Sequence, residues 1–327
     1  MTVQKSQSLK SETFFEKMGH FFEKPVVRDL LPLAGLIIIF VVFAFLTDGR
    51  IMRIGSIKLI LSQVYVPMIA SAGVFLIMTV GGLDFSQGSI LGMASIVISY
   101  LSFTSIPLAI LAGMLTGAAI GAFNGLFHVK FKIASFIVTI CTMFLFRGFC
   151  AYLTTNAPVA AAQIVTTLNN DVLKIICTVA VLLIVFFVFQ YTKVGISLKA
   201  IGAGETAARF SGIRTDLMKF GVYVASGALT GFAAFLNVIK VGSITATAGN
   251  QLETQILISL VLGGLPISGG SKVRFSNIIV GTLIYCILNN GLVMMRYDTA
   301  VQQMIKGVIF LAVVALTIDR QSLKVIK

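Results

Sequence analysis

The side chains most often used for catalysis or metal binding are scarce in this sequence. The chain has two histidines, His20 and His128, and no H-E-x-x-H motif, which would place two zinc ligands on one helix face. Its four cysteines lie inside apolar stretches and form no C-x-x-C pair: Cys141, Cys150, Cys177 and Cys286. We therefore expect the cysteines to pack as small apolar side chains, and we expect no catalytic residue and no metal site.

One glycine-rich segment, Gly263–Lys272 (GGLPISGGSK), superficially resembles a phosphate-binding loop. A P-loop requires the order G-x-x-x-x-G-K-[ST], because its backbone N–H groups and its lysine must surround the phosphates. Here the segment ends in Gly-Gly-Ser-Lys and follows an apolar stretch instead of a soluble strand. We expect no cofactor and no enzyme activity in this chain. If transport is ATP-driven, ATP and Mg²⁺ would be bound by a partner ATPase.

Asp84 is the one acid beside a glycine-rich interruption of the apolar stretches. Carboxylates at membrane depth are costly and often functional, which would place Asp84 on a transport path. The alternative, which we favour, is a helix cap, in which Asp84 or Ser86 accepts from free N–H groups where the next helix starts. Few other acids lie in apolar stretches, so the sequence offers few side chains that could form a proton or sodium relay.

Three further polar side chains fall inside apolar stretches. Arg147 would either extend to the outer surface or face a solvated path. Asn289 and Asn290 are adjacent amides, of which one would hydrogen-bond between helices and the other would line a path. The candidate path residues are Asp84, Phe85, Asn124, Arg147, Asn289 and Asn290.

The elements that must position these residues are membrane helices. Hydrophobic residues make up 57% of the chain and charged residues only 11%, with a mean hydropathy of +0.99, whereas soluble domains carry roughly 25% charged residues. The net charge of +13 comes from Lys and Arg in short segments between apolar stretches, which is typical of membrane topology and not of nucleic-acid binding. The predicted fold class is all-α, a polytopic transmembrane helical bundle.

A helix needs about 20 residues to cross roughly 30 Å of hydrocarbon, and the sequence predicts ten spans in one transmembrane domain, residues 30–318. The predicted spans are Leu30–Thr47, Leu59–Val80, Ile90–Leu101, Leu108–Phe127, Ile133–Leu153, Ile175–Tyr191, Phe220–Ile239, Ile256–Leu265, Ser276–Met295 and Met304–Ile318. Residues 1–29 lack a signal-peptide pattern and are expected to stay as a tail, with a second tail at 319–327.

The distribution of Lys and Arg orients these spans. Seventeen of the 25 fall in the tails and in the links on the side of the tails, and six fall in links on the opposite side. The remaining two, Arg147 and Lys306, lie inside spans or at their ends. Because Lys and Arg are enriched in cytoplasmic loops, both termini are predicted to be cytoplasmic.

The third and eighth spans are short for a full crossing. Short, glycine-interrupted segments in a transporter often mark broken helices near the substrate path. Gly81–Ser89 (GGLDFSQGS) and Gly263–Ser271 (GGLPISGGS) are similar to each other, which suggests an internal repeat. The candidate helix breaks are Gly81, Gly82, Gly263 and Gly264. The sequence leaves open whether each segment is a cytoplasmic link or a re-entrant break.

The fourth span carries a row of glycines. Gly113, Gly117 and Gly121 recur at every fourth position and therefore share one helix face. Such a face allows a neighbouring helix to approach closely, and we predict that it serves helix packing.

A polar segment, Lys193–Lys219, lies between two strongly apolar regions and carries five Lys and Arg. Its centre predicts a short helix, because Gly204 precedes Glu205 in the first turn and Gly212 follows the last turn. A structured basic loop of this kind suits the docking of a cytoplasmic partner. The alternative is an ordinary loop that is basic only because it faces the cytoplasm.

Several stretches together resemble the permease subunits of bacterial ABC importers for monosaccharides, of the ribose/galactose/arabinose/xylose type. They are GGLDFSQGS with SILGMAS, ASFIVTICTMFLFRG at Ala134–Gly148, AIGAGETAARFSGI at Ala200–Ile213, and VLGGLPISGG through VGTLIYCILNNGL at Val261–Leu292, in the family's order. The resemblance implies a bundle of about ten helices in the bacterial inner membrane, paired with a second permease copy around a translocation path. It also implies alternating access driven by two ATPase subunits, with cargo delivered by an extracytoplasmic binding protein.

By the same resemblance, the segment Ala200–Ile213 is the coupling helix that fits a groove on the ATPase. The implied coupling residues are Ala200, Gly202, Gly204, Glu205, Ala207, Ala208, Arg209, Phe210, Ser211 and Gly212.

Two departures from the family's pattern bear on the cargo. A glycine-rich stretch of the family is replaced here by Ser271–Phe275, and Asn250–Leu257 matches the family only loosely. The expected cargo is a pentose or a hexose. The alternatives are a nucleoside, an autoinducer furanone or a branched-chain amino acid. An ion-coupled secondary transporter is less favoured, because few acids lie in the spans.

Overall fold

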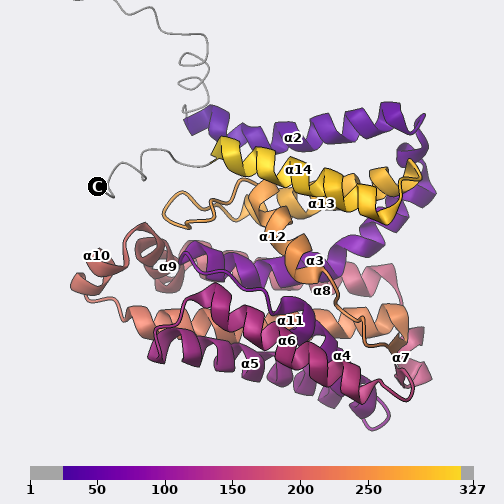
Figure 1. The fold of residues 1–327 in the computed structure, drawn as a ribbon, viewed down its shortest axis with the longest axis horizontal. Coiled ribbons are helices and arrows are strands. Elements are labelled where there is room, and N and C mark those ends of the chain that lie inside the picture. Colours follow the sequence, from indigo (N-terminus) through magenta and orange to yellow (C-terminus); the bar gives the residue numbers. More distant parts are fainter. Residues whose placement is uncertain (1–24, 318–327) are drawn as a thin grey trace, which may run out of the picture.

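In the computed structural model, the structure describes the backbone of residues 25–317 and the side chains of residues 32–315. This part of the chain is helical except for two short strands and the links (Figure 1). The elements are α2 (Pro25–Leu46), η1 (Arg50–Met52), α3 (Ile54–Thr79), α4 (Gln87–Leu101), α5 (Ile106–Lys130), α6 (Ser135–Leu153), β1 (Val159–Ala160), α7 (Gln163–Thr167), α8 (Asp171–Tyr191), α9 (Lys193–Ala203), α10 (Glu205–Phe210), α11 (Thr215–Val241), β2 (Ser243–Ile244), α12 (Leu252–Leu262), α13 (Ser276–Met294) and α14 (Thr299–Thr317).

Every predicted span corresponds to a helix. Within the described residues, six helices are long and apolar enough to cross a membrane, and four further apolar helices are shorter. The first helix begins at Pro25, inside the segment predicted to be a tail, and most of that tail lies outside the described residues. The polar segment Lys193–Lys219 is more ordered than a loop, because α9 fills its first half and α11 begins within it.

The long helices alternate in direction (Figure 1). Helices α2, α6, α11 and α13 run away from the end of the molecule that carries α9 and α10, and α3, α5, α8 and α14 run towards it. Both ends of the described chain lie at this same end, while α7 lies at the opposite end. There β1 pairs antiparallel with β2, which ties the segment after α6 to the segment after α11.

Helices α5 and α11 pack through glycines on both sides. A Cβ atom at Gly117 would overlap the backbone carbonyl of Gly227, and one at Gly227 would overlap the carbonyl of Gly117. One turn further along, a Cβ atom at Gly231 would overlap the carbonyl of Gly113. The glycine row therefore is a packing face, as predicted, and it brings two backbones into direct contact.

The two GGL segments have different conformations. After α3, the chain turns at Gly81 (φ +80°) and returns as an extended segment into the molecule, where α4 starts. The segment after α12 is a link with several turns, in which Gly264 has φ +89°. The two segments are in contact, because a Cβ atom at Gly81 would lie 3.1 Å from the Ser268 carbonyl oxygen. The first is thus a re-entrant break, and the second is a link at the α9 end.

A second break lies elsewhere than the glycines suggested. Gly263 and Gly264 end α12, but the interruption inside the bundle is the segment of residues 242–251 between α11 and α12. It leaves α11 at Gly242 in a left-handed conformation and reaches α12 after Gln251, which also has positive φ. Gly263 instead serves packing, because a Cβ atom there would overlap the Asn277 backbone of α13.

Candidate functional site

The two breaks meet inside the molecule. A Cβ atom at Gly88 would overlap the Gly249 carbonyl and the Glu253 carboxylate, and one at Gly249 would overlap the Gly88 carbonyl. The first turns of α4 and α12 therefore abut. Free N–H groups and the positive ends of helix dipoles gather at such a place, so polar or acidic side chains are needed there.

At the first break, Asp84 is fully buried and accepts three hydrogen bonds. One carboxylate oxygen accepts from the backbone N–H of Ser86 at 2.8 Å and from its hydroxyl at 2.6 Å, and the other accepts from the Gln87 amide at 2.6 Å. The Ser86 hydroxyl in turn accepts from Asn124 of α5 at 2.8 Å. Asp84 and Asn124, both predicted path residues, thus belong to one buried network.

Helices α6 and α11 complete this network. The Gln87 amide donates to Ser226 at 3.1 Å and accepts from the Thr230 hydroxyl. The backbone N–H of Phe85 donates to Thr139 of α6 at 3.2 Å. The bond from Phe85 gives a partner to a backbone N–H that the interrupted helix leaves without one. The bonds of Gln87 join side chains and tie the break to α11.

The expected cap of α4 has a different form. Ser86 occupies the N-cap position, but no side-chain cap hydrogen bond forms there within the described chain. Its hydroxyl is already bonded to Asp84 and Asn124. Asp84 binds the N–H of Ser86, one residue before the helix proper. The acid therefore fixes the entry into α4 without capping its first turn.

At the second break, a single arginine holds the start of α12. Arg147 of α6 donates to Asn250 at 2.8 Å and forms an ion pair with Glu253 at 3.0 Å. Arg147 thus binds residues of the second break, and its place on a solvated path stays a prediction. The second Glu253 oxygen is buried and has no hydrogen-bond partner among the described residues.

A cavity of about 540 Å³ opens beside the second break. Helices α12, α13 and α14 and both GGL segments contribute to its wall. It is lined by Met78, Leu83, Phe85, Gln251, Thr254, Leu257, Ile258, Val261, Ile267, Tyr285, Gln303, Lys306, Gly307 and Phe310. Of the predicted path residues, only Phe85 lines it.

The two asparagines of α13 have different partners. Asn289 accepts from Lys306 of α14 at 2.9 Å, and Asn290 donates to Gln63 of α3 at 2.9 Å. Both therefore bond between helices, and Asn289 supports the cavity wall from behind through Lys306. Lys306 was not among the predicted path residues. The available signal was that it is the only lysine inside a predicted span.

Helices α9 and α10 form one end of the molecule (Figure 1). The predicted short helix is present as α10, between Gly204 and Gly212. Arg209 is bonded within the chain, to Glu205, Thr215 and Asp216. The next residue, Phe210, is 89% exposed.

The other predicted coupling residues lie around this helix. Ala208 is buried, and Gly202 packs on backbone, because a Cβ atom there would overlap Thr79 and Gly270. A hydrogen bond from Lys219 lowers the pKa of the Glu205 carboxyl below its usual value, against the opposing effect of partial burial. Of the remaining coupling residues, α9 contains Ala200 and α10 contains Ala207. Gly204 joins these two helices, and Ser211 and Gly212 follow α10.

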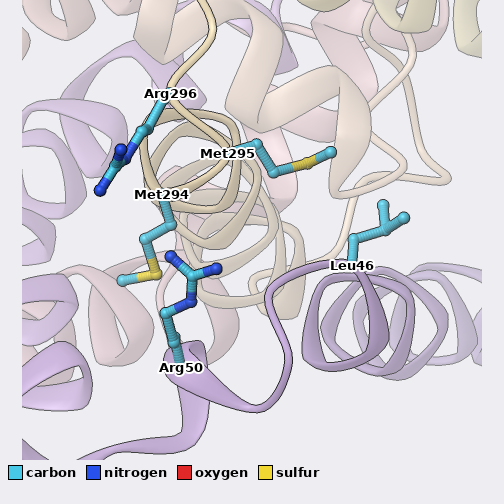
Figure 2. A pocket seen from close by; sticks show the side chains of 5 residues that line it. All are labelled: Leu46, Arg50, Met294, Met295 and Arg296. Atoms are coloured by element: carbon cyan, nitrogen blue, oxygen red, sulfur yellow. The ribbon is translucent and has the colours of Figure 1, made fainter.

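The opposite end carries a second, positively charged cavity. It measures about 390 Å³ and is lined by Leu46, Arg50, Met294, Met295 and Arg296. Figure 2 shows Arg50 extending from η1 towards Met294, with Arg296 on the other side of Met294.

Comparisons with known proteins give one consistent result. Residues 56–314 match the family described as the permease component of the branched-chain amino acid transport system. The ribose import permease protein of Escherichia coli strain K12 is 29% identical over 92% of this chain and 97% of its own length. That of Bacillus subtilis strain 168 is 30% identical over 97% and 99%. The D-allose transport system permease protein of Escherichia coli is 27% identical over 93% and 92%. No solved structure gives a significant match.

Proposed function

The chain belongs to the family of permease components described for branched-chain amino acid transport systems, and we propose that it forms the translocation path for a monosaccharide in a bacterial ATP-driven importer. The relatives that cover nearly the whole chain are import permeases for ribose and D-allose. Multi-pass location in the inner membrane agrees with the six long apolar helices. ATP and Mg²⁺ belong, in this proposal, to partner ATPase subunits.

We propose that residues 30–318 form one permease domain with ten crossings. The six long helices supply six of them, and the four shorter apolar helices supply the others, two of which are completed by the breaks. The alternating helix directions support this count (Figure 1). We propose that the α9 end faces the cytoplasm, because cytoplasmic loops are enriched in Lys and Arg.

The observation that carries the coupling proposal is the exposed phenyl ring of Phe210. A large apolar side chain is 89% exposed at the tip of a short helix outside the bundle, beside basic residues. Exposed aromatic side chains of this kind serve as anchors in protein interfaces. We propose that α10 inserts into a groove of the ATPase and that Arg209 positions the ring by holding α10 against the start of α11.

The same end offers a route for the motion. Gly202 of α9 lies on the backbone at Thr79 and Gly270, and these two residues are hydrogen-bonded to each other. A displacement of α9 and α10 would therefore act directly on the re-entrant break and on the link after α12. Alternating access in this proposal is a rigid-body movement transmitted through these contacts.

At the opposite end, we propose that the extracytoplasmic binding protein docks with acidic residues. Arg50 and Arg296 converge on one cavity there. The variant Arg50→Glu with Arg296→Glu should weaken stimulation of the ATPase by the binding protein, with Arg53→Glu as the control because Arg53 does not line the cavity. Equal stimulation of the ATPase in both variants would contradict the proposed docking site.

The coupling proposal is tested with Phe210→Ala. Loss of an interface anchor costs about 2 kcal/mol or more, or roughly 30-fold in affinity, so the tagged variant should retain little ATPase on purification and should lose ATP-dependent uptake. Phe144→Ala is the matched control, because Phe144 is also exposed but belongs to the long helix α6 and not to α9 or α10. Undiminished ATPase recovery with Phe210→Ala would contradict the proposal.

The cargo has alternatives that the same transport assay separates. The family description favours a branched-chain amino acid, and a nucleoside or an autoinducer furanone is also compatible with a permease of this kind. Uptake of D-ribose or D-allose but not of L-leucine would support a monosaccharide. An ion-coupled secondary transporter would continue uptake after ATP depletion and stop when the ion gradient collapses.

A further inference from the structure

The cavity beside the second break is polar in one half and apolar in the other. Helices α12 and α14 run in the same direction along it, towards the α9 end (Figure 1). Gln251 and Thr254 lie at the start of α12, and Gln303 and Lys306 lie in the first half of α14. The later residues of both helices contribute only apolar side chains or glycine to the lining. Apart from the Tyr285 hydroxyl on α13, the polar side chains of the lining therefore lie in the half of the cavity farther from the α9 end.

Lys306 is the strongest feature of this half. It is 9% exposed, its ammonium donates to Asn289 at 2.9 Å, and it lies 5.7 Å from the centre of the Tyr285 ring. An ammonium carries three donors, and Asn289 accepts from one of them. A buried lysine in an apolar helix that lines a cavity marks a functional site.

We propose that Gln251, Thr254, Gln303 and Lys306 form a binding subsite for a neutral, hydroxyl-rich cargo inside the permease. The inference rests on the proposed function and adds the residues that recognise the cargo. Amides and a hydroxyl both donate and accept, which suits the hydroxyl groups on the edge of a sugar ring. The aromatic side chains Phe85, Tyr285 and Phe310 supply apolar walls for its C–H faces.

The charges of the site favour a sugar over an amino acid. A zwitterion needs an anionic partner for its ammonium, yet no carboxylate lines the cavity among the described residues. The nearest acid of α12, Glu253, is paired with Arg147. The volume of about 540 Å³ falls within the roughly 300–1,000 Å³ of small-molecule sites. The apolar half beyond it offers few hydrogen bonds, so a bound sugar is not held along the whole path.

Two adjacent glutamines provide a matched test. Gln303 lines the cavity, whereas Gln302 donates to the Tyr297 carbonyl at the start of the same helix. We would compare Gln303→Leu with Gln302→Leu in proteoliposomes that contain the complete importer, measuring ATP-dependent uptake of D-ribose, D-allose, D-fructose and L-leucine. Gln303→Leu should lower uptake of the transported sugar about five-fold or more, as expected for one lost hydrogen bond, and Gln302→Leu should stay within about two-fold.

Lys306→Met should lower sugar uptake about ten-fold or more, because a charged donor is lost, while Lys306→Arg keeps a donor and should retain more activity. Since Lys306→Met also leaves Asn289 without its donor, yield and unfolding temperature are measured in parallel. Gln303→Leu keeps the test decisive, because the Gln303 side chain lines the cavity and makes no hydrogen bond to another described residue. If the unmodified importer carries a sugar and the two glutamine variants behave alike, the subsite is overturned. If it carries L-leucine and no sugar, the proposed function itself fails, and the cargo class of the subsite fails with it.

Discussion

The polar groups at the two helix breaks are bonded in different ways. At the first, Asp84 is buried and accepts from Ser86 and Gln87, which in turn bond to neutral side chains of α5 and α11. At the second, Arg147 of α6 is paired with Glu253 of α12, and one Glu253 oxygen has no hydrogen-bond partner among the described residues. The second break also borders the larger cavity. From this difference we propose that the first break is a fixed element and that contacts at the second change as cargo passes.

The largest expected effect is at the first break. Asp84→Ala would leave the Ser86 N–H, the Ser86 hydroxyl and the Gln87 amide without their acceptor. Each of the three buried donors left without this acceptor costs about 1 kcal/mol or more, which predicts a destabilisation of about 3 kcal/mol or more. Thermal unfolding and yield in detergent would measure it, with Glu253→Ala as the comparison. Equal destabilisation by the two alanine variants would remove the distinction between the breaks.

The next effect concerns the junction of the breaks. Gly88→Ala would push a methyl group into the Gly249 carbonyl and the Glu253 carboxylate, and overpacking of this kind costs about 1–3 kcal/mol. The control is Gly148→Ala on α6, where an added Cβ atom meets nothing within 4 Å among the described residues. Unfolding temperatures that fall equally, or not at all, for the two variants would show that α4 and α12 are not in backbone contact.

A matched change from carboxylate to amide sharpens the comparison. Glu253→Gln keeps an acceptor for Arg147 and removes the charge of an ion pair whose arginine is partly exposed and whose carboxylate is buried. Because the hydrogen bond to Arg147 is kept, the loss of stability should be about 1 kcal/mol or less. Asp84→Asn places a second amide N–H group near the Gln87 donor and should cost more. We expect Glu253→Gln to alter the rate of ATP-driven uptake more than stability. A large loss of stability with normal uptake would contradict this.

The smallest expected effect is the pH dependence of α10. The pKa of Glu205 is lowered by Lys219, so the stabilisation is present above the unfolded pKa of Glu, about 4.3, and is lost as the pH falls through the lowered folded value. The protection factors of the α10 amides, which are corrected for the intrinsic pH dependence of hydrogen exchange, should therefore be unchanged from pH 7 to pH 5 and fall below pH 4. Glu205→Gln should abolish this dependence. A dependence that persists in Glu205→Gln would assign it to another group.

The helices could be predicted from the sequence because apolar stretches and glycines report directly on burial. All ten predicted spans correspond to helices, and Gly117 packs as its spacing suggested. The second break could not be located, because residues 242–251 have no sequence feature as distinct as the segment Gly263–Ser271. That segment is a link and not a break. Lys306 could not be predicted as a cavity residue, because its position depends on its bond to Asn289 and on the packing of α14 beside α12. Only the folded chain brings these elements together.

The most direct test of the central claim is water access to the two breaks. In a variant whose four native cysteines are replaced, we would introduce Thr254→Cys at the cavity or Thr230→Cys in the buried network and measure their reaction with a small charged thiol reagent. The account predicts that Cys at 254 reacts and that its rate changes when ATP is added to the complete importer, while Cys at 230 stays unreactive. Fast reaction at 230 together with protection at 254 would place the path at the first break and contradict the account.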